Sequence, residues 1–405
     1  MTEPHHKPRW YVMLIVVSTI LSVAFTIANY FKPPPKAVLP REVKVKGPGG
    51  LNLEFEIKDA PPPVNEAKPD GEKYPTGYEP NPKGTDAFLK SLDKPTIRDA
   101  GPELFEKVPG TAPNGVFLYR PFKKWYLLKY GIEWIVGTQK IGDCVSWGWG
   151  HAVSFCQASN CELGLSSEFD MAATEAIYGA SRVEARGSPG DGLRDVGGWG
   201  DGSYGGAAAK AVHGKPGVLW RRKYPFADLT TYSGDRAKQW GAYGCGGQND
   251  QGKADKEAAN FTVASVALVR NFEEAAAAIK SGYPVPVCSG QGFSSRRDKD
   301  GFAAPSGSWA HCMCFIGWRG GNRPGLLCLN SWGPNWISGD KWPSDQPDGS
   351  FWVDMSVVNR MLAGNDSFAV SGVRGFPFRD LSNGDWVRVD VRAEPSAETS
   401  FALAP

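Results

Sequence analysis

One cysteine stands at a position suited to nucleophilic chemistry. Of the eight cysteines, Cys144 follows a loop that contains Gly142, and it opens a helical pattern with Asp143 at the N-cap position. In the first helical turn the helix dipole lowers the pKa of a thiol and favours the nucleophilic thiolate. A buried structural cysteine at a helix start is the alternative, and this position alone does not decide between the two.

The five histidines leave one partner for such a thiol. His151 lies seven residues after Cys144 on the same predicted helix, about 10 Å along its axis, so it cannot touch the thiol. Three others precede an apolar stretch or end a helix pattern: His5, His6 and His213. His311 lies in the strand pattern Trp309–Trp318, where a polar ring needs a hydrogen-bond partner. As an imidazolium it would stabilise the thiolate and later protonate the leaving group.

An asparagine follows the next strand pattern. Asn330 comes nineteen residues after His311, directly after Leu329, and Trp332 is close behind it. An asparagine there can accept a hydrogen bond from the second ring nitrogen of a histidine, which fixes the tautomer and aims the ring at the thiol. A neighbouring tryptophan would shield this bond from water. The three blocks together form one candidate site.

Three separated blocks in the order Cys, His and Asn resemble the papain family of cysteine proteases. The resemblance implies that Cys144 is the nucleophile, His311 the base and Asn330 the residue that orients it, with Trp332 as the shield. It also implies that the Gln139 side chain forms an oxyanion hole with the backbone N–H of Cys144. Gln139 precedes the cysteine by five residues, where papain has six.

The resemblance covers about residues 114–375 and extends to substrate-binding positions. Asp201-Gly202-Ser203-Tyr204 resembles the family's Asn-Gly-Gly-Tyr segment, which binds substrate backbone, and Ala310 stands where papain has Asp. The residues that this places against the substrate are Gly202, Ser203, Ala310, Cys288 and Cys312. The two cysteines fall near the side-chain pocket that selects the substrate, and they would make this pocket rather apolar.

Helical patterns precede strand patterns along this region. The helical ones are Val145–Phe155, Glu168–Tyr178, Ala207–Val212 and Phe272–Ile279. The strand patterns are Tyr283–Cys288, Trp309–Trp318, Leu326–Leu329 and Ser350–Asp354. This order predicts an α+β protein of two lobes. The resemblance implies a papain-like fold, with the nucleophile helix in a helical lobe beside a β-barrel-like lobe.

Residues 10–31 form an uncharged stretch that follows a short polar N-terminus of residues 1–9. About 20 apolar residues span a bilayer as a helix, and aromatic residues flank both ends of this stretch. We predict a single transmembrane anchor; a cleaved signal peptide is the alternative. Basic residues lie on both sides, which leaves the orientation open, and we favour a catalytic domain on the exterior or periplasmic side.

Residues 32–113 hold 16 of the 32 prolines and many charges. We predict an extended stalk there, with short strands at Val43–Val45 and Leu51–Ile57. A pro-segment that covers the active site is the alternative, which we favour less because no long amphipathic helix is evident. Residues 376–405 are predicted to be a C-terminal extension with a disordered end.

The net charge of +2 argues against a general nucleic-acid binder. We predict no cofactor, since Gly200–Gly205 fits G-x-G-x-x-G but lacks the strand and βαβ pattern of a dinucleotide site. We also predict no metal, because Cys312 and Cys314 face away from His311 in a strand. A disulfide between Cys156 and Cys161 stays open.

The leading hypothesis is a membrane-tethered, papain-like cysteine peptidase that forms an acyl-enzyme. The expected partners are a peptide or protein substrate and, through residues 10–31, a membrane, with a monomeric catalytic domain. A transpeptidase or amidase on the same site is the second hypothesis. The third is a catalytically silent binding or structural protein with the same fold.

Overall fold

The computed structural model describes the backbone of residues 42–46 and 52–56, and all atoms of residues 74–107, 114–185, 200–382 and 386. The predicted anchor at residues 10–31 lies outside these ranges. Within them, no helix is both long and apolar enough to cross a membrane. The two short strands predicted near residues 43 and 55 are confirmed: β1 (Glu42–Lys46) and β2 (Asn52–Glu56) form an antiparallel pair.

A group of helices carries the candidate nucleophile. It comprises α5 (Tyr119–Tyr130), α6 (Cys144–Glu162), α7 (Thr174–Arg182), α8 (Gly205–His213), α9 (Gly234–Tyr243) and α10 (Lys253–Ala258). The helix α6 is buried along almost its whole length, as its apolar sequence requires. Its two glycines permit close packing, since a Cβ at Gly148 would lie 2.7 Å from Cys312 Sγ and one at Gly150 2.8 Å from Thr174 Cγ2.

A five-stranded antiparallel sheet carries the candidate base. Its strands are β3 (Gly115–Phe117), β5 (Val285–Arg297), β6 (Ala303–Arg319), β7 (Gly325–Leu329) and β8 (Ser350–Asp354). Their order is β3-β6-β7-β8, with β5 also paired to β6. Closure would need β8 to pair with β3 or β5, but among the described strands it pairs only with β7. The sheet is therefore open, and the expected barrel-like closure is wrong.

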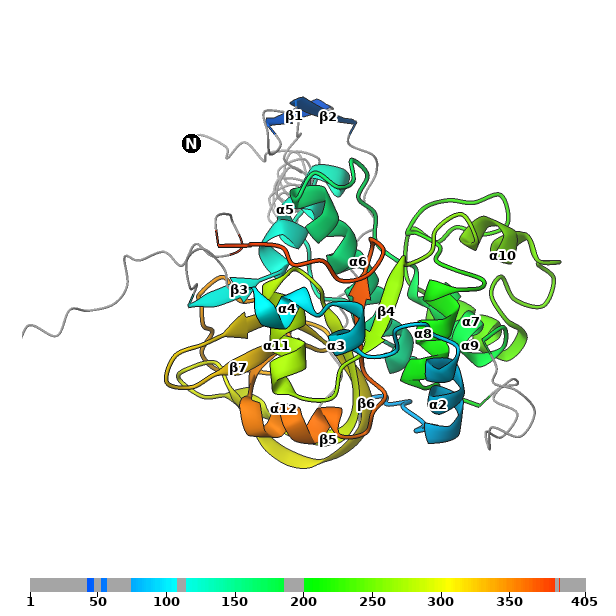
Figure 1. Cartoon of the computed structure of the whole chain (residues 1–405). Helices are drawn as coiled ribbons and strands as arrows, with labels where there is room; N and C mark the ends of the chain where they lie inside the picture. Colours follow the sequence, from blue (N-terminus) through cyan, green and yellow to red (C-terminus); the bar gives the residue numbers. More distant parts are fainter. Residues whose placement is uncertain are drawn as a thin grey trace, which may run out of the picture. The chain divides into compact units, whose positions relative to one another are not determined.

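Further elements cover the sheet and join it to the helices. Helices α11 (Phe272–Lys280) and α12 (Met355–Leu362) pack on the sheet, while β4 (Ser265–Leu268) and β9 (Phe368–Ser371) form a separate antiparallel pair (Figure 1). Helix α6 packs against both β5 and β6. This contact brings the start of the nucleophile helix next to the strand that contains His311. The predicted order of helices followed by strands is confirmed.

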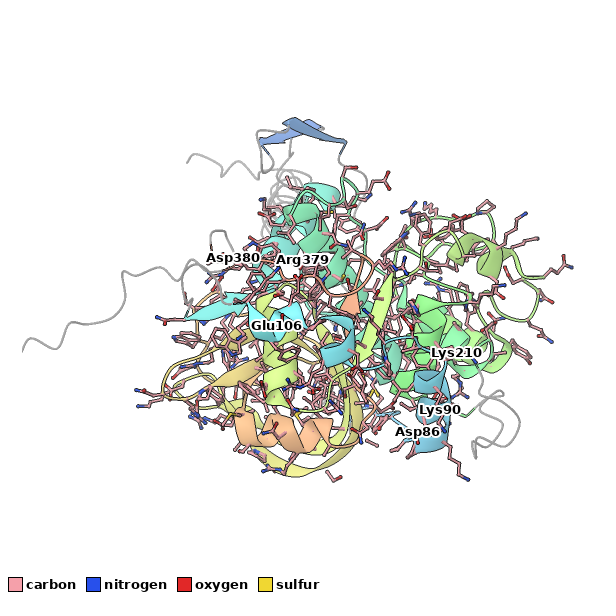
Figure 2. All side chains as sticks on the ribbon, in the orientation of Figure 1. Asp86, Lys90, Glu106, Lys210, Arg379 and Asp380 are labelled. Carbon is pink, nitrogen blue, oxygen red and sulfur yellow. The ribbon has the colours of Figure 1, made fainter. Side chains whose placement is uncertain are left out.

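Residues 74–107, which we predicted to belong to an extended stalk, are instead folded onto the domain. They contain α2 (Pro82–Lys90), α3 (Ile97–Ala100) and α4 (Glu103–Glu106). Figure 2 shows Asp86 and Lys90 of α2 beside Lys210 of α8, and the two helices are in contact. We call residues 81–107 the N-terminal strap.

One apolar side chain from each helix of the strap is buried and holds the strap on the domain. Phe88, Ile97 and Leu104 are each at least nine-tenths buried. Pro82 stands in the first turn of α2, where the missing N–H costs no hydrogen bond, and the Asn81 side chain caps this helix through the N–H of Gly84. One apolar anchor per short helix leaves no periodicity to read, which is why a proline-rich sequence suggested an extended chain.

Candidate active site

Cys144 is the first residue of α6 and is fully buried. Asp143 holds the N-cap position as predicted, but its side chain forms no capping bond, because the backbone at φ −103° and ψ 24° is not in the extended conformation that capping uses. Its carboxyl instead accepts a hydrogen bond from the Tyr232 hydroxyl at 3.0 Å. The Asp143 side chain is thus turned away from the helix N–H groups that adjoin the thiol.

His311 and Asn330 are joined as the sequence predicted. Nε2 of His311 lies 2.8 Å from Oδ1 of Asn330, and both residues are buried. The same oxygen accepts the N–H of Ser331 at 2.7 Å, so it is the acceptor and Nε2 carries the hydrogen. Nδ1 has no partner. The imidazole is therefore in the tautomer that presents a lone pair at Nδ1.

Trp332 covers this pair. Its ring centroid lies 4.5 Å from that of His311 with an interplanar angle of 33°. The ring of Trp309 packs on Trp332 at 4.6 Å and stands edge-on to the imidazole at 6.2 Å. The aromatic walls keep water from the His311–Asn330 hydrogen bond, which strengthens it.

The thiol of Cys144 lies beside the β6 backbone next to His311. The backbone N–H groups of Cys312 and Gly77 are hydrogen-bond donors toward it and lower its pKa, but burial outweighs them and raises the pKa well above the ordinary value. Burial also lowers the pKa of His311 to about 4, although the bond to Asn330 opposes this. In this state the pair is a neutral thiol and a neutral imidazole.

Gln139 is buried with its amide fixed from both ends. Nε2 donates to the carbonyl of Ile141 at 2.9 Å and to that of Pro75 at 3.1 Å, while Oε1 accepts from the Ser331 hydroxyl. The side-chain N–H is thus aimed at a carbonyl of the chain's own N-terminal region. Trp332 Nε1 donates to the same Pro75 oxygen at 3.0 Å.

Residues 74–80, the 74–80 segment, lie across most of the predicted site residues. The Tyr74 ring stacks on Trp332 at 4.8 Å and 10°. The N–H groups of Gly77 and Tyr78 both donate to the carbonyl of Ala310, at 3.1 and 3.0 Å. The chain itself therefore covers the place where a substrate would be expected, and the pro-segment alternative gains its structural basis.

The segment also pairs with the predicted substrate strip. Ser203 N donates to the Gly77 carbonyl at 2.8 Å, and Glu79 N donates to the Ser203 carbonyl at 2.8 Å, which makes a parallel bridge centred on Tyr78. Ser203 and Ala310 are thus brought together as backbone-binding positions. Gly202 adjoins Glu79, since a Cβ there would lie 2.7 Å from the Glu79 side chain.

Gly77 marks the closest approach of this segment to the domain. A Cβ at Gly77 would lie only 1.8 Å from the carbonyl oxygen of Gly142, so no larger residue fits without movement. Its N–H approaches the Cys144 thiol. The segment therefore places a backbone N–H against the thiol.

Sequence reasoning missed two residues that hold the substrate strip. Arg182 of α7 is buried and donates to the carbonyl of Gly202, and the Tyr178 hydroxyl lies 3.1 Å from the Gly202 nitrogen. Gly202 needs this support because its φ of +108° is open only to glycine at little cost. Arg182 lies beyond the predicted helix pattern Glu168–Tyr178, so no signal in the sequence marked it.

The side-chain pocket differs from the expectation of an apolar one. Cys288 and Cys312 stand directly opposite each other on β5 and β6, and both interact with the Tyr78 phenol. The buried carboxyl of Asp366 also faces this phenol and accepts its hydrogen bond. The pocket therefore combines two thiols with a carboxyl group. The expectation that Cys288 and Cys312 would make it rather apolar is corrected.

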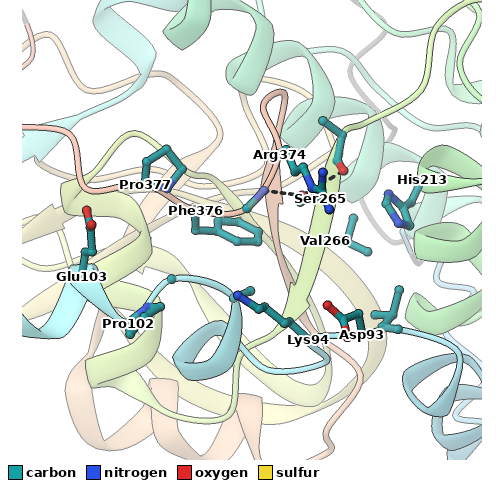
Figure 3. A pocket seen from close by; sticks show the side chains of 15 residues that line it. Asp93, Lys94, Pro102, Glu103, His213, Ser265, Val266, Arg374, Phe376 and Pro377 are labelled. Carbon is teal, nitrogen blue, oxygen red and sulfur yellow. Dashed lines mark hydrogen bonds between the residues drawn. The ribbon is translucent and has the colours of Figure 1, made fainter.

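Other cavities and clusters do not compete with this site. A surface pocket of about 580 Å³ is lined by Lys94, His213 and Arg374 near Ser265, whose hydroxyl accepts the N–H of Gly375 (Figure 3). None of the predicted catalytic residues lines it. Throughout the described ranges, no group of three or more His, Cys, Asp or Glu residues could hold a metal ion. All eight cysteines are buried and free, including Cys156 and Cys161.

The sequence matches no family model and no curated protein. Among solved structures, xylellain, a cysteine protease from Xylella fastidiosa, aligns with 18% identity and a TM-score of 0.46, over 76% of this chain and 100% of that chain. ProCathepsin B S9 from Trypanosoma congolense aligns with 12% identity and a TM-score of 0.41, over 71% and 88%. Bromelain from Ananas comosus with the E64 inhibitor gives 13% and 0.38, over 64% and 99%. These neighbours are distant cysteine proteases, so the functional proposal depends on this chain's own residues.

Proposed function

We propose that this protein is a papain-like cysteine peptidase that hydrolyses peptide bonds through an acyl-enzyme. The observation that carries the proposal is the His311–Asn330 bond of 2.8 Å, which leaves Nδ1 as an unpartnered base in the strand that adjoins the Cys144 thiol. Nδ1 of the buried His151 is also without a partner, so what sets His311 apart is its bond to Asn330 and its place beside the Cys144 thiol.

In the proposed reaction, Nδ1 of His311 takes the thiol proton as Cys144 Sγ attacks the carbonyl carbon of a peptide bond. The side-chain N–H of Gln139 and the backbone N–H of Cys144 stabilise the oxyanion. The C–N bond breaks, and His311 passes its proton to the leaving amine. Water, deprotonated by the same nitrogen, then attacks the thioester and releases the acid.

The full chain is proposed to be latent while the 74–80 segment occupies the site. Burial under this segment disfavours both the thiolate and the imidazolium, since it raises the pKa of Cys144 and lowers that of His311. Departure of the segment would readmit water and lift both penalties.

A thiol-directed epoxide tests the proposal most simply. We expect Cys144 to be alkylated ahead of the other seven cysteines once the 74–80 segment is displaced, and we expect peptide hydrolysis to vanish in Cys144→Ala. Cys314→Ala is the matched control, since that thiol is equally buried but lies outside the site. Alkylation spread over several cysteines, or hydrolysis that survives Cys144→Ala, would refute the assignment.

The filled site also favours one alternative, a catalytically silent binding protein. Against it, the Gln139 amide points into the site and donates to the Pro75 carbonyl at 3.1 Å. Hydrolysis and transpeptidation differ only in the acceptor of the acyl group. Product analysis with an added amine nucleophile separates them, because a transpeptidase would give the amide and a peptidase the acid.

We further propose that residues 10–31 anchor a monomeric catalytic domain on the exterior side of a membrane. The support is the length of the uncharged stretch. Carbonate extraction of membranes that carry the full chain should leave it in the pellet, and protease added from outside should reach the domain. Release into the supernatant, or protection of the domain from protease, would contradict this.

A further inference from the structure

Tyr78 fills a closed pocket at the site. Its side chain is almost completely buried, and its phenol oxygen lies 4.0 Å from the position of a Cβ built at Gly364. The pocket walls come from distant parts of the chain, with Cys288 on β5 and Cys312 on β6. The polar end of the pocket is Asp366, whose carboxylate accepts the phenol hydrogen bond.

Asp366 is held in place by three further hydrogen-bond donors. The N–H groups of Gly205 and Gly206, at the start of α8, each donate to it at 2.7 Å, and so does the Thr85 hydroxyl. A Cβ at Gly205 would lie 2.2 Å from the Asp366 carbonyl oxygen, so this approach requires glycine. The carboxylate is fixed, and its remaining acceptor capacity faces the pocket.

The Asp366 carboxylate can accept a hydrogen bond from a neutral phenol. Its charge is already stabilised by three hydrogen bonds, two of them from the N-terminus of a helix. Burial nevertheless raises its pKa to about 6, while it raises the pKa of Tyr78 well above the ordinary value, so the phenol keeps its proton as a donor. The thiols of Cys288 and Cys312 are weak hydrogen-bond acceptors, so they would not replace the water lost by a buried ammonium or guanidinium group.

We infer that Asp366 is a specificity-determining residue and that the pocket now filled by Tyr78 selects tyrosine side chains in peptide substrates. This rests on the proposed peptidase function. The 74–80 segment runs parallel to the Ser203 strip, and Tyr78 shows what the pocket accepts. A phenylalanine would fill the same volume, but the buried carboxylate would lose the hydrogen bond from the phenol and keep only its other three.

A matched pair of substrates tests the inference on the full chain. Acetyl-Tyr-Gly and acetyl-Phe-Gly coumarylamides differ by one hydroxyl, and the ratio of their kcat/KM values does not depend on how many molecules have an open site. We expect a preference for the tyrosine substrate of about tenfold or more. In Asp366→Ala the ratio should fall to about one while the phenylalanine substrate is still cleaved. Equal rates in the wild type, or a preference for the matching arginine substrate, would overturn the inference.

A second measurement needs neither peptidase activity nor a folded Asp366 variant. In Tyr78→Phe the 74–80 segment loses the hydrogen bond to Asp366, so iodoacetamide should alkylate Cys144 about tenfold faster than in the wild type. Thr76→Ala, at an exposed position of the same segment, should leave this rate unchanged. If no coumarylamide is cleaved but Tyr78→Phe speeds alkylation, the peptidase proposal fails and the pocket assignment stands. Equal alkylation rates in Tyr78→Phe and wild type would overturn the pocket assignment.

Discussion

At the scale of single residues, the site depends on one buried hydrogen bond. Asn330 fixes the tautomer of His311, and the indole of Trp332 covers their contact. The identities of Cys144, His311 and Asn330 as a set could be predicted, because their residue types and order are themselves the signal. The role of Asp366 could not be predicted, because an aspartate before a short strand carries no signal in the sequence. Only the fold brings it next to Tyr78.

The first prediction concerns Asn330→Ala. The change leaves the Nε2–H of His311 buried without an acceptor, and such a loss costs about 1–3 kcal/mol, which is about 5-fold to 150-fold in kcat/KM. The effect should fall on kcat, with KM little changed, when peptide hydrolysis is followed. Asn335→Ala, at an exposed position of the same loop, is the control. A normal kcat in Asn330→Ala would show that the bond does not orient the base.

The second prediction concerns His151 and pH. Burial lowers its pKa to about 3, against about 6.5 in an unfolded chain. The unfolded chain therefore binds a proton first, so the stability that His151 contributes is complete above pH 6.5 and is lost as the pH falls toward 3. The Tm of the wild type should drop between pH 7.5 and pH 5, and it should drop less in His151→Leu. Equal drops would mean that His151 takes no part.

At the scale of elements, α6, β6 and β7 bring the site together. They could be predicted because α6 is largely apolar and because β7 and the second half of β6 have apolar β patterns; the exposed, polar first half of β6 was not predicted. The helices of the strap could not be predicted, because each has a single buried apolar side chain. The prolines of this region suggested an extended chain instead. The barrel-like closure failed for a different reason, since strand pairing over long separations leaves no local trace in sequence.

The third prediction concerns the fit of the 74–80 segment. In Gly77→Ala the added Cβ would meet the Gly142 carbonyl at 1.8 Å, so the segment must leave its place. Hydrolysis by the full chain should rise by tenfold or more, in line with about 1.4 kcal/mol or more of lost closure. Thr76→Ala, at an exposed position of the segment, should behave like the wild type. Unchanged activity in Gly77→Ala would show that the segment does not limit access.

The fourth prediction concerns the strap as part of the domain. Ile97 is fully buried, so Ile97→Ala should lower the free energy of unfolding by about 2–5 kcal/mol. Lys90→Ala on α2, at a partly exposed position, should change it little. Denaturant unfolding of the two variants gives the comparison. A small loss for Ile97→Ala would mean that the strap binds only loosely.

At the scale of the whole molecule, the site is closed by a segment whose C-terminal side is built into the domain. The Thr85 hydroxyl bonds Asp366, and the start of the C-terminal extension joins the strap through Phe376 N and the Ala100 carbonyl at 3.2 Å. The near-zero net charge leaves substrate choice to shape and hydrogen bonding. We therefore expect a chain trimmed to begin at Tyr74 to remain less active than Gly77→Ala in the same hydrolysis assay; full activity on trimming alone would contradict this.

The most direct test of the central claim is the mass of the chain after brief reaction with a peptide nitrophenyl ester and an acid quench. The account predicts one acyl group per chain, mapped to Cys144 and absent from Cys144→Ala. An acyl group on another residue, or peptide hydrolysis at the wild-type rate in Cys144→Ala, would contradict it.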